Sequence, residues 1–127
     1  MNRRNALKML AAAGGTQAVR AQSKRPIQLH AELDVDPARE KEMLANFRKV
    51  FRPVISKQPG FVSVRLLKFR ETMQGAAPAY KYRLVISFET EEQRRTWVAT
   101  DDHQRVWPSI GNTLRGKDFP VILYETM

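Results

Sequence analysis

Three side chains in the second half of the chain combine a titratable group with two large aromatic surfaces. His103 precedes Trp107 by four residues, so both project from the same side of a helical segment. Histidine titrates near neutral pH and is therefore a candidate general base. Trp97 and Trp107 can stack a flat aromatic ligand. The alternatives are that His103 caps or hydrogen-bonds its own helix, and that both indoles belong to the hydrophobic core.

A pocket for these side chains is expected between the second helix and the apolar face of a sheet. Tyr82 and Leu84 alternate with polar residues on one strand and face the same side as the predicted helices. We therefore predict a small-molecule cavity lined by the indoles and His103, with Tyr82 and Leu84 nearby. For Tyr82, and for Tyr80 beside it, packing at the edge of the sheet is the alternative.

A second set of side chains faces away from the helices. Strand alternation places His30 and Glu32 on the polar side of the first strand, with Arg65 and Arg83 on the same side of its neighbours. A sheet then separates His30 from His103, so no metal site formed by both histidines is expected. The acids of the first strand face bases of the third, which favours structural ion pairs. This surface is either solvated or packed against a second copy of the chain.

The elements that position these groups follow in the order strand, helix, strand, strand, helix, strand. This order predicts an α+β fold, a ferredoxin-like βαββαβ sandwich with an antiparallel four-stranded sheet. The helices are expected to cover an apolar sheet face that includes Val121 and Leu123 of the last strand. The strands are predicted at 27–36, 61–69, 80–88 and 119–125, and the helices at 37 to about 52 and from 91 onward.

Capping signals set the expected limits of the two helices. Asp36 before a proline is a typical N-cap, and Pro53 is expected to end or kink the first helix. Thr90 with Gln93 forms a capping box that opens the second helix. Asp101, or the aspartate after it, is expected to cap a further helical turn that carries the histidine.

The first residues are typical of an export signal. Residues 1–21 run from a basic start, through a short apolar stretch, to small side chains at a cleavage site. Arg3 and Arg4, with Leu and Lys three and four positions beyond Arg4, resemble a bacterial twin-arginine signal. We therefore expect export to the periplasm by the twin-arginine machinery, a linker at 22–26 and one domain at 27–127. An ordinary basic N-terminus is the alternative.

Composition narrows the classes of function. The 127 residues suit a single domain, and no apolar run approaches the about 18 to 20 residues that a membrane span needs. The net charge of +9 includes +4 from the leader, and the other charges are interspersed, so nucleic-acid binding is not expected. The chain has no cysteine, which excludes disulfides and thiolate chemistry.

Four short motifs, in this order and spacing, resemble the antibiotic biosynthesis monooxygenase (ABM) domain of the dimeric α+β barrel superfamily. The resemblance covers about residues 27–126. The motifs are Asp36-Pro37, the turn Gln58-Pro59-Gly60-Phe61, the strand Leu84–Glu89 with acids behind it, and Asp102-His103-Gln104-Arg105-Val106-Trp107.

The resemblance implies a homodimer in which two sheets face each other across a barrel, with His30, Glu32, Arg65 and Arg83 inside it. Some family members oxidise phenols or quinols with molecular oxygen and no metal or flavin. His103 would then deprotonate a small aromatic or quinol-like substrate, and no cofactor is expected. Haem-degrading members use an asparagine on the first strand, which this chain lacks, so that branch is disfavoured. The alternative function is a non-catalytic, ligand-binding or stress-associated barrel.

Overall fold

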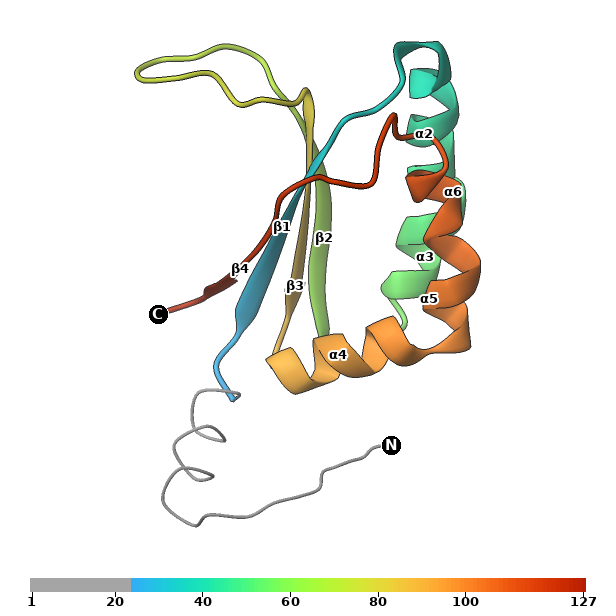
Figure 1. The fold of residues 1–127 in the computed structure, drawn as a ribbon. Helices are drawn as coiled ribbons and strands as arrows, with labels where there is room; N and C mark the ends of the chain where they lie inside the picture. Colours follow the sequence, from blue (N-terminus) through green and yellow to red (C-terminus); the bar gives the residue numbers. More distant parts are fainter. Residues whose placement is uncertain (1–23) are drawn as a thin grey trace.

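The computed structural model describes residues 24–127, and the predicted leader at 1–21 lies outside them. Four antiparallel strands form one sheet in the order β2-β3-β1-β4, and helices lie against one of its faces (Figure 1). This arrangement confirms the predicted ferredoxin-like α+β sandwich. The strands are β1 (Ile27–Leu33), β2 (Phe61–Lys68), β3 (Tyr82–Phe88) and β4 (Val121–Glu125).

The helical layer consists of two irregular rods rather than two continuous helices. This layer lies on one side of the sheet, and the loop between β2 and β3 projects to the other side (Figure 1). The first rod contains η2 (Pro37–Arg39), α2 (Glu40–Asn46), η3 (Phe47–Phe51) and α3 (Arg52–Ile55). The second bends sharply between its first two helices (Figure 1) and contains α4 (Glu91–Ala99), α5 (Asp101–Val106) and α6 (Pro108–Gly111).

Two outcomes were predicted for Pro53, an end or a kink of the helix near Arg52, and the end is wrong because the first rod continues to Ile55. The five preceding residues form the π-helical segment η3, in which the Arg52 N–H bonds to the Phe47 carbonyl five residues back. This wider turn accommodates a proline, which lacks an N–H and would clash with a regular α-turn. It also keeps an apolar stripe with a four-residue spacing directed at the sheet.

Two threonines cap the second rod. As predicted, the Thr90 hydroxyl accepts a hydrogen bond from the Gln93 N–H at 3.1 Å and begins α4. The cap of α5 is Thr100, whose hydroxyl accepts from the His103 N–H at 3.1 Å. The expectation that Asp101 or its neighbour caps this turn was wrong, because Thr100 already has the extended backbone of an N-cap.

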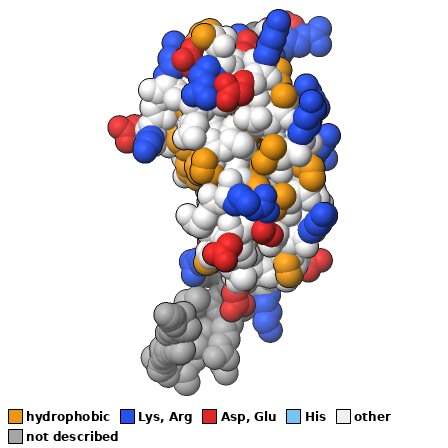
Figure 2. All heavy atoms as spheres, turned by 90° about the vertical axis from the view of Figure 1, so that its right-hand side faces the viewer, with side chains coloured by type: hydrophobic (Ala, Val, Ile, Leu, Met, Phe, Trp, Pro, Cys, Tyr) orange, Lys and Arg blue, Asp and Glu red, His pale blue; other side chains and the backbone are white. Residues whose placement is uncertain are grey.

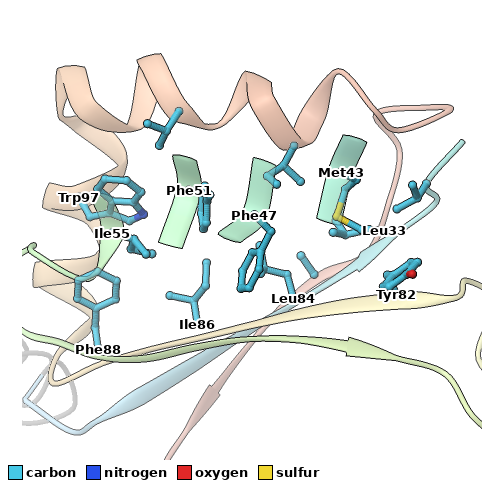
Figure 3. Packing of buried hydrophobic residues seen from close by; sticks show 14 of the residues in the cluster. Leu33, Met43, Phe47, Phe51, Ile55, Tyr82, Leu84, Ile86, Phe88 and Trp97 are labelled. Carbon is cyan, nitrogen blue, oxygen red and sulfur yellow. The ribbon is translucent and has the colours of Figure 1, made fainter. Parts of the chain in front are cut away.

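The hydrophobic core lies between the rods and the inner sheet face (Figure 3). Met43, Phe47, Phe51 and Ile55 point from the first rod toward the sheet and are buried. They meet inner-face side chains that include Leu33, Leu84, Ile86 and Phe88. The edge strand β4 differs from expectation, since Val121 and Leu123 are 51% and 43% exposed because the rods do not reach over them.

The outer sheet face bears the charged side chains that alternation assigned to it. Glu32 lies opposite Arg83 in the register of β1 and β3, and their side chains form the predicted cross-strand ion pair at 3.0 Å. Asp34 follows the end of β1 and pairs instead with Arg115, at 2.6 Å. The first strand is thus three residues shorter than predicted, because the chain turns into the first rod there.

The described surface carries both signs of charge. Figure 2 shows acidic and basic side chains over the helical side, with small apolar patches between them. Among residues 24–127, no helix has the length and apolar character needed to cross a membrane.

Candidate active site

A cavity of about 170 Å³ lies between the helical layer and the inner face of the sheet. Both rods, the sheet and the segment before β4 contribute to its wall. Of the described residues that line it, only Arg94 and His103 have ionisable side chains. The lining residues are Leu29, Ala31, Phe51, Leu84, Ile86, Arg94, Trp97, Val98, His103, Trp107, Phe119 and Val121.

His103 lies between the two tryptophans. Its imidazole stands edge-on to Trp97, with ring centroids 5.0 Å apart and planes at 82°. It is also nearly parallel to the indole of Trp107, with centroids 6.4 Å apart and planes at 9°. Phe51 stands edge-on to both indoles, at 6.1 and 6.2 Å. The structure therefore brings His103, Trp97, Trp107 and Leu84 to one apolar cavity.

The His103 ring is held in its neutral form at neutral pH. Burial and then the nearby positive charge of Arg94 lower its pKa below 6.5. Its Nδ1 atom is buried and makes no hydrogen bond with any described residue. Asp102 does not offset these effects, because its carboxylate accepts hydrogen bonds from Arg105 and Gln58 at 3.0 and 3.3 Å. A neutral imidazole in this position can accept a proton.

Arg94 was not predicted as a site residue. It lies one helical turn before Trp97, a spacing that places both side chains on one face of α4. Its Nε and Nη2 atoms each donate a hydrogen bond of 2.7 Å to the Glu91 carboxylate. Those bonds raise the pKa of Arg94, which therefore stays charged. The three-residue spacing from Trp97 was the available sequence signal.

The structure places Tyr82 away from this cavity. Its buried hydroxyl donates to the Glu40 carboxylate, and burial together with that bond raises the pKa of Tyr82 to about 12. Tyr82 instead borders a larger hollow of about 490 Å³ beneath the β2–β3 loop. The charged groups there pair with described neighbours, since Arg83 binds Glu32 and Lys68 lies 3.8 Å from Glu40. The smaller apolar cavity is the better candidate site.

The set predicted for a dimer barrel lies on the opposite side of the sheet. His30 packs edge-on against Tyr124 at 4.9 Å and shares a hydrogen bond of 2.9 Å with Gln28, rather than contacting Glu32, Arg65 or Arg83 directly. Burial and the charge of Arg83 lower its pKa. His30 and His103 are thus separated by the sheet. No cluster of three potential metal ligands occurs within residues 24–127.

The fold places the chain in the class of ferredoxin-like α+β proteins, with a cavity between helices and sheet. A family model described as "Antibiotic biosynthesis monooxygenase" matches residues 26–107. The chain belongs to this ABM family, as its motifs predicted. No curated protein matches the chain significantly.

Solved structures show the same fold at low sequence identity. A Caulobacter crescentus protein described as a putative antibiotic biosynthesis monooxygenase is 17% identical, with 87% of this chain and 98% of that chain covered and a TM-score of 0.65. SnoaB, a cofactor-independent oxygenase from Streptomyces nogalater, is 16% identical over 80% and 93%, with a TM-score of 0.64. A Jannaschia protein described as dimeric and ferredoxin-like is 14% identical over 80% and 99%, with a TM-score of 0.68.

Proposed function

We propose that the cavity is the active site of a cofactor-independent monooxygenase that acts on a small aromatic or quinol-like molecule. The observation that carries this proposal is the neutral His103 ring against two indoles in a cavity whose described lining is apolar except for His103 and Arg94. Membership of the ABM family and the likeness to SnoaB, itself a cofactor-independent oxygenase, support the reaction class.

The proposed reaction begins with proton transfer from a phenolic hydroxyl to His103. The phenolate is electron-rich and can donate an electron to molecular oxygen, after which a carbon–oxygen bond forms at the ring. Cleavage of the O–O bond leaves one oxygen on the ring as a second carbonyl. The other leaves as water with the ring proton and the proton held by His103. One phenol and one O₂ thus become one quinone and one water.

An oxygen electrode tests the proposal with phenols and hydroquinones as substrates. We expect oxygen consumption by the wild type and a loss of about 10² or more in kcat for His103→Gln, the usual size of a general-base contribution. The circular dichroism spectrum should stay unchanged in the variant. Equal oxygen uptake by both proteins would contradict the role of His103. Ligand binding without oxygen uptake in the wild type would support the alternative function, a non-catalytic ligand-binding barrel.

We also propose that two copies pair through the outer sheet face, a surface that the helices leave uncovered. Ile122 and Tyr124 on this face are 44% and 51% exposed and lie opposite His30 and Gln28 of β1. The Glu32–Arg83 pair is on the same face. A two-fold interface joins identical patches, and a face bearing both charge signs suits such pairing. The dimeric Jannaschia structure supports this assembly.

Light scattering coupled to size exclusion tests the assembly. The wild type is expected to elute as a dimer and Ile122→Glu as a monomer, because a buried unpaired carboxylate opposes association. Lys49→Glu, an exposed change on the helical layer, is the matched control. A monomeric wild type would overturn the proposal.

Export rests on the sequence of residues 1–21 alone. We propose passage through the twin-arginine route to the periplasm, supported by Arg3, Arg4 and the cleavage-like small residues. Replacing both arginines by lysine and fractionating the cells tests it. Unchanged distribution of the variant would contradict this route.

A further inference from the structure

Arg94 brings a positive charge to the cavity that its partner only partly neutralises. Glu91 accepts hydrogen bonds from both Arg94 and Arg95, so two guanidinium groups share one carboxylate. The Arg94 side chain is 19% exposed and lines the cavity, whereas that of Arg95 is 75% exposed and does not. Within the described chain, no hydrogen bond uses the Nη1 atom of Arg94. The cavity therefore favours a ligand with negative charge.

The volume of the cavity limits how many rings can enter. An apolar protein cavity of about 150 Å³ holds one benzene molecule, and this cavity measures about 170 Å³. Its aromatic wall cannot retreat easily, because Phe51 is 1% exposed and packs edge-on against both indoles. Further fused rings would not fit inside this volume and would have to extend through its mouth, where Val98 and Val121 are 37% and 51% exposed.

We infer that the cavity selects a single-ring phenol and binds it as the phenolate, with Arg94 as the anion-binding and specificity-determining residue. This inference rests on the proposed function for the role of His103. The hydroxyl proton moves to the imidazole, and the phenolate oxygen that remains pairs with the Arg94 guanidinium. The ring itself lies among the indoles, which provide apolar faces. A neutral ring of the same size packs among the indoles but forms no ion pair with Arg94.

Ligand binding can be followed directly, because the two tryptophans of the chain, Trp97 and Trp107, both line the cavity. The probe is p-cyanophenol, an acidic single-ring phenol, and its methyl ether p-methoxybenzonitrile is the ligand control without a hydroxyl. Quenching of tryptophan fluorescence gives the Kd. Ultraviolet absorption distinguishes bound phenolate from bound phenol. Naphthol and anthrol are compared by titration calorimetry.

Two neighbouring arginines provide the matched variants. Arg94→Gln should weaken p-cyanophenol binding by about tenfold or more and abolish the phenolate absorption. Arg94→Lys should regain most of the affinity because the charge returns. Arg95→Gln removes the other partner of Glu91 but no group of the cavity wall, so it should raise the Kd by less than Arg94→Gln does. The methyl ether should bind weakly and equally to all four proteins.

The outcomes separate this inference from the proposed function. Equal losses in Arg94→Gln and Arg95→Gln, or anthrol binding as tightly as p-cyanophenol, would overturn it. So would bound ligand that stays in the phenol form. Selective phenolate binding without oxygen consumption would support the inference and contradict the oxygenase. Oxygen consumption that is fastest with anthrol would support the oxygenase and contradict the inference.

Discussion

Arg94 and His103 line one cavity from two successive helices, and the charge of the arginine acts on the imidazole. After burial, the positive charge of Arg94 is the second cause that lowers the pKa of His103. Since both groups face an apolar space, their interaction is screened less than that of a surface pair. The protonation state of the proposed base, His103, therefore depends on a residue of another helix.

The pH profile of oxygenation should reveal this coupling. A general base is active when unprotonated, so a lowered pKa keeps His103 active below pH 6.5. Activity should fall only as the pH drops through that lowered pKa. Arg94→Gln removes the positive charge that helps to lower the pKa of His103. The acid limb of the profile should therefore move to higher pH. The measurement is kcat/KM against pH, and an unmoved acid limb would contradict the coupling.

The free energy of unfolding should also depend on pH through His103, and the lowered pKa of this residue sets the direction. The unfolded state binds the His103 proton at a higher pH than the folded state, so stability falls as the pH drops below 6.5. His30 adds to this slope, because its pKa is also lowered. Urea unfolding between about pH 7 and 5 should give a smaller slope for His103→Gln than for the wild type. Identical slopes would exclude a shifted pKa at His103.

The two threonine caps separate a stability effect from a positioning effect. Thr100 accepts from the His103 N–H and donates to the Trp97 carbonyl at 2.7 Å, so it joins two cavity residues. Thr90 caps α4 in the same manner, but its partner Gln93 does not line the cavity. Each change to alanine should cost about 1 kcal/mol in unfolding experiments. Only Thr100→Ala should shift the pH profile of kcat/KM, and equal profiles would show that its cap does not position His103.

Tyr82→Phe tests where the tyrosine belongs. Removal of its hydroxyl takes a buried hydrogen bond from Glu40 and should destabilise the fold by about 1–2 kcal/mol. The KM for a phenol should remain that of the wild type, since Tyr82 lies outside the cavity. Tyr80→Phe is the control, because its hydroxyl has no hydrogen-bond partner in the described part of the chain. A raised KM in Tyr82→Phe would show that this residue contributes to substrate binding.

Two glycines with positive φ angles form a matched pair. Gly60 has a φ of +80°, and an added Cβ would lie 2.1 Å from the Gln93 side chain. Gly75 has a φ of +86° with no atom within 4 Å of that position. Gly75→Ala should cost about 1–2 kcal/mol from backbone strain alone. Gly60→Ala should cost more by urea unfolding, because Gln93 must also move, and equal costs would mean that it moves freely.

The sequence by itself determined the order of elements and the side of the sheet that each strand residue faces. Alternation with a period of two is a local property of a strand, so it places His30 on the sheet face opposite the helix that carries His103. The four-residue spacing in a helix likewise placed His103 and Trp107 on one side. These patterns depend on backbone geometry, which neighbouring residues set.

Tertiary structure decided which of these side chains meet. Tyr82 and Leu84 share the inner sheet face, but only Leu84 lies at the cavity, whereas the Tyr82 hydroxyl bonds to Glu40 of the first rod. Arg94 became a site residue through the folding of α4 against α5 and the sheet. Alternation also could not predict the exposure of Val121, which depends on how far the helical layer extends. Contacts between distant segments depend on how the elements pack together, and local sequence patterns do not predict them.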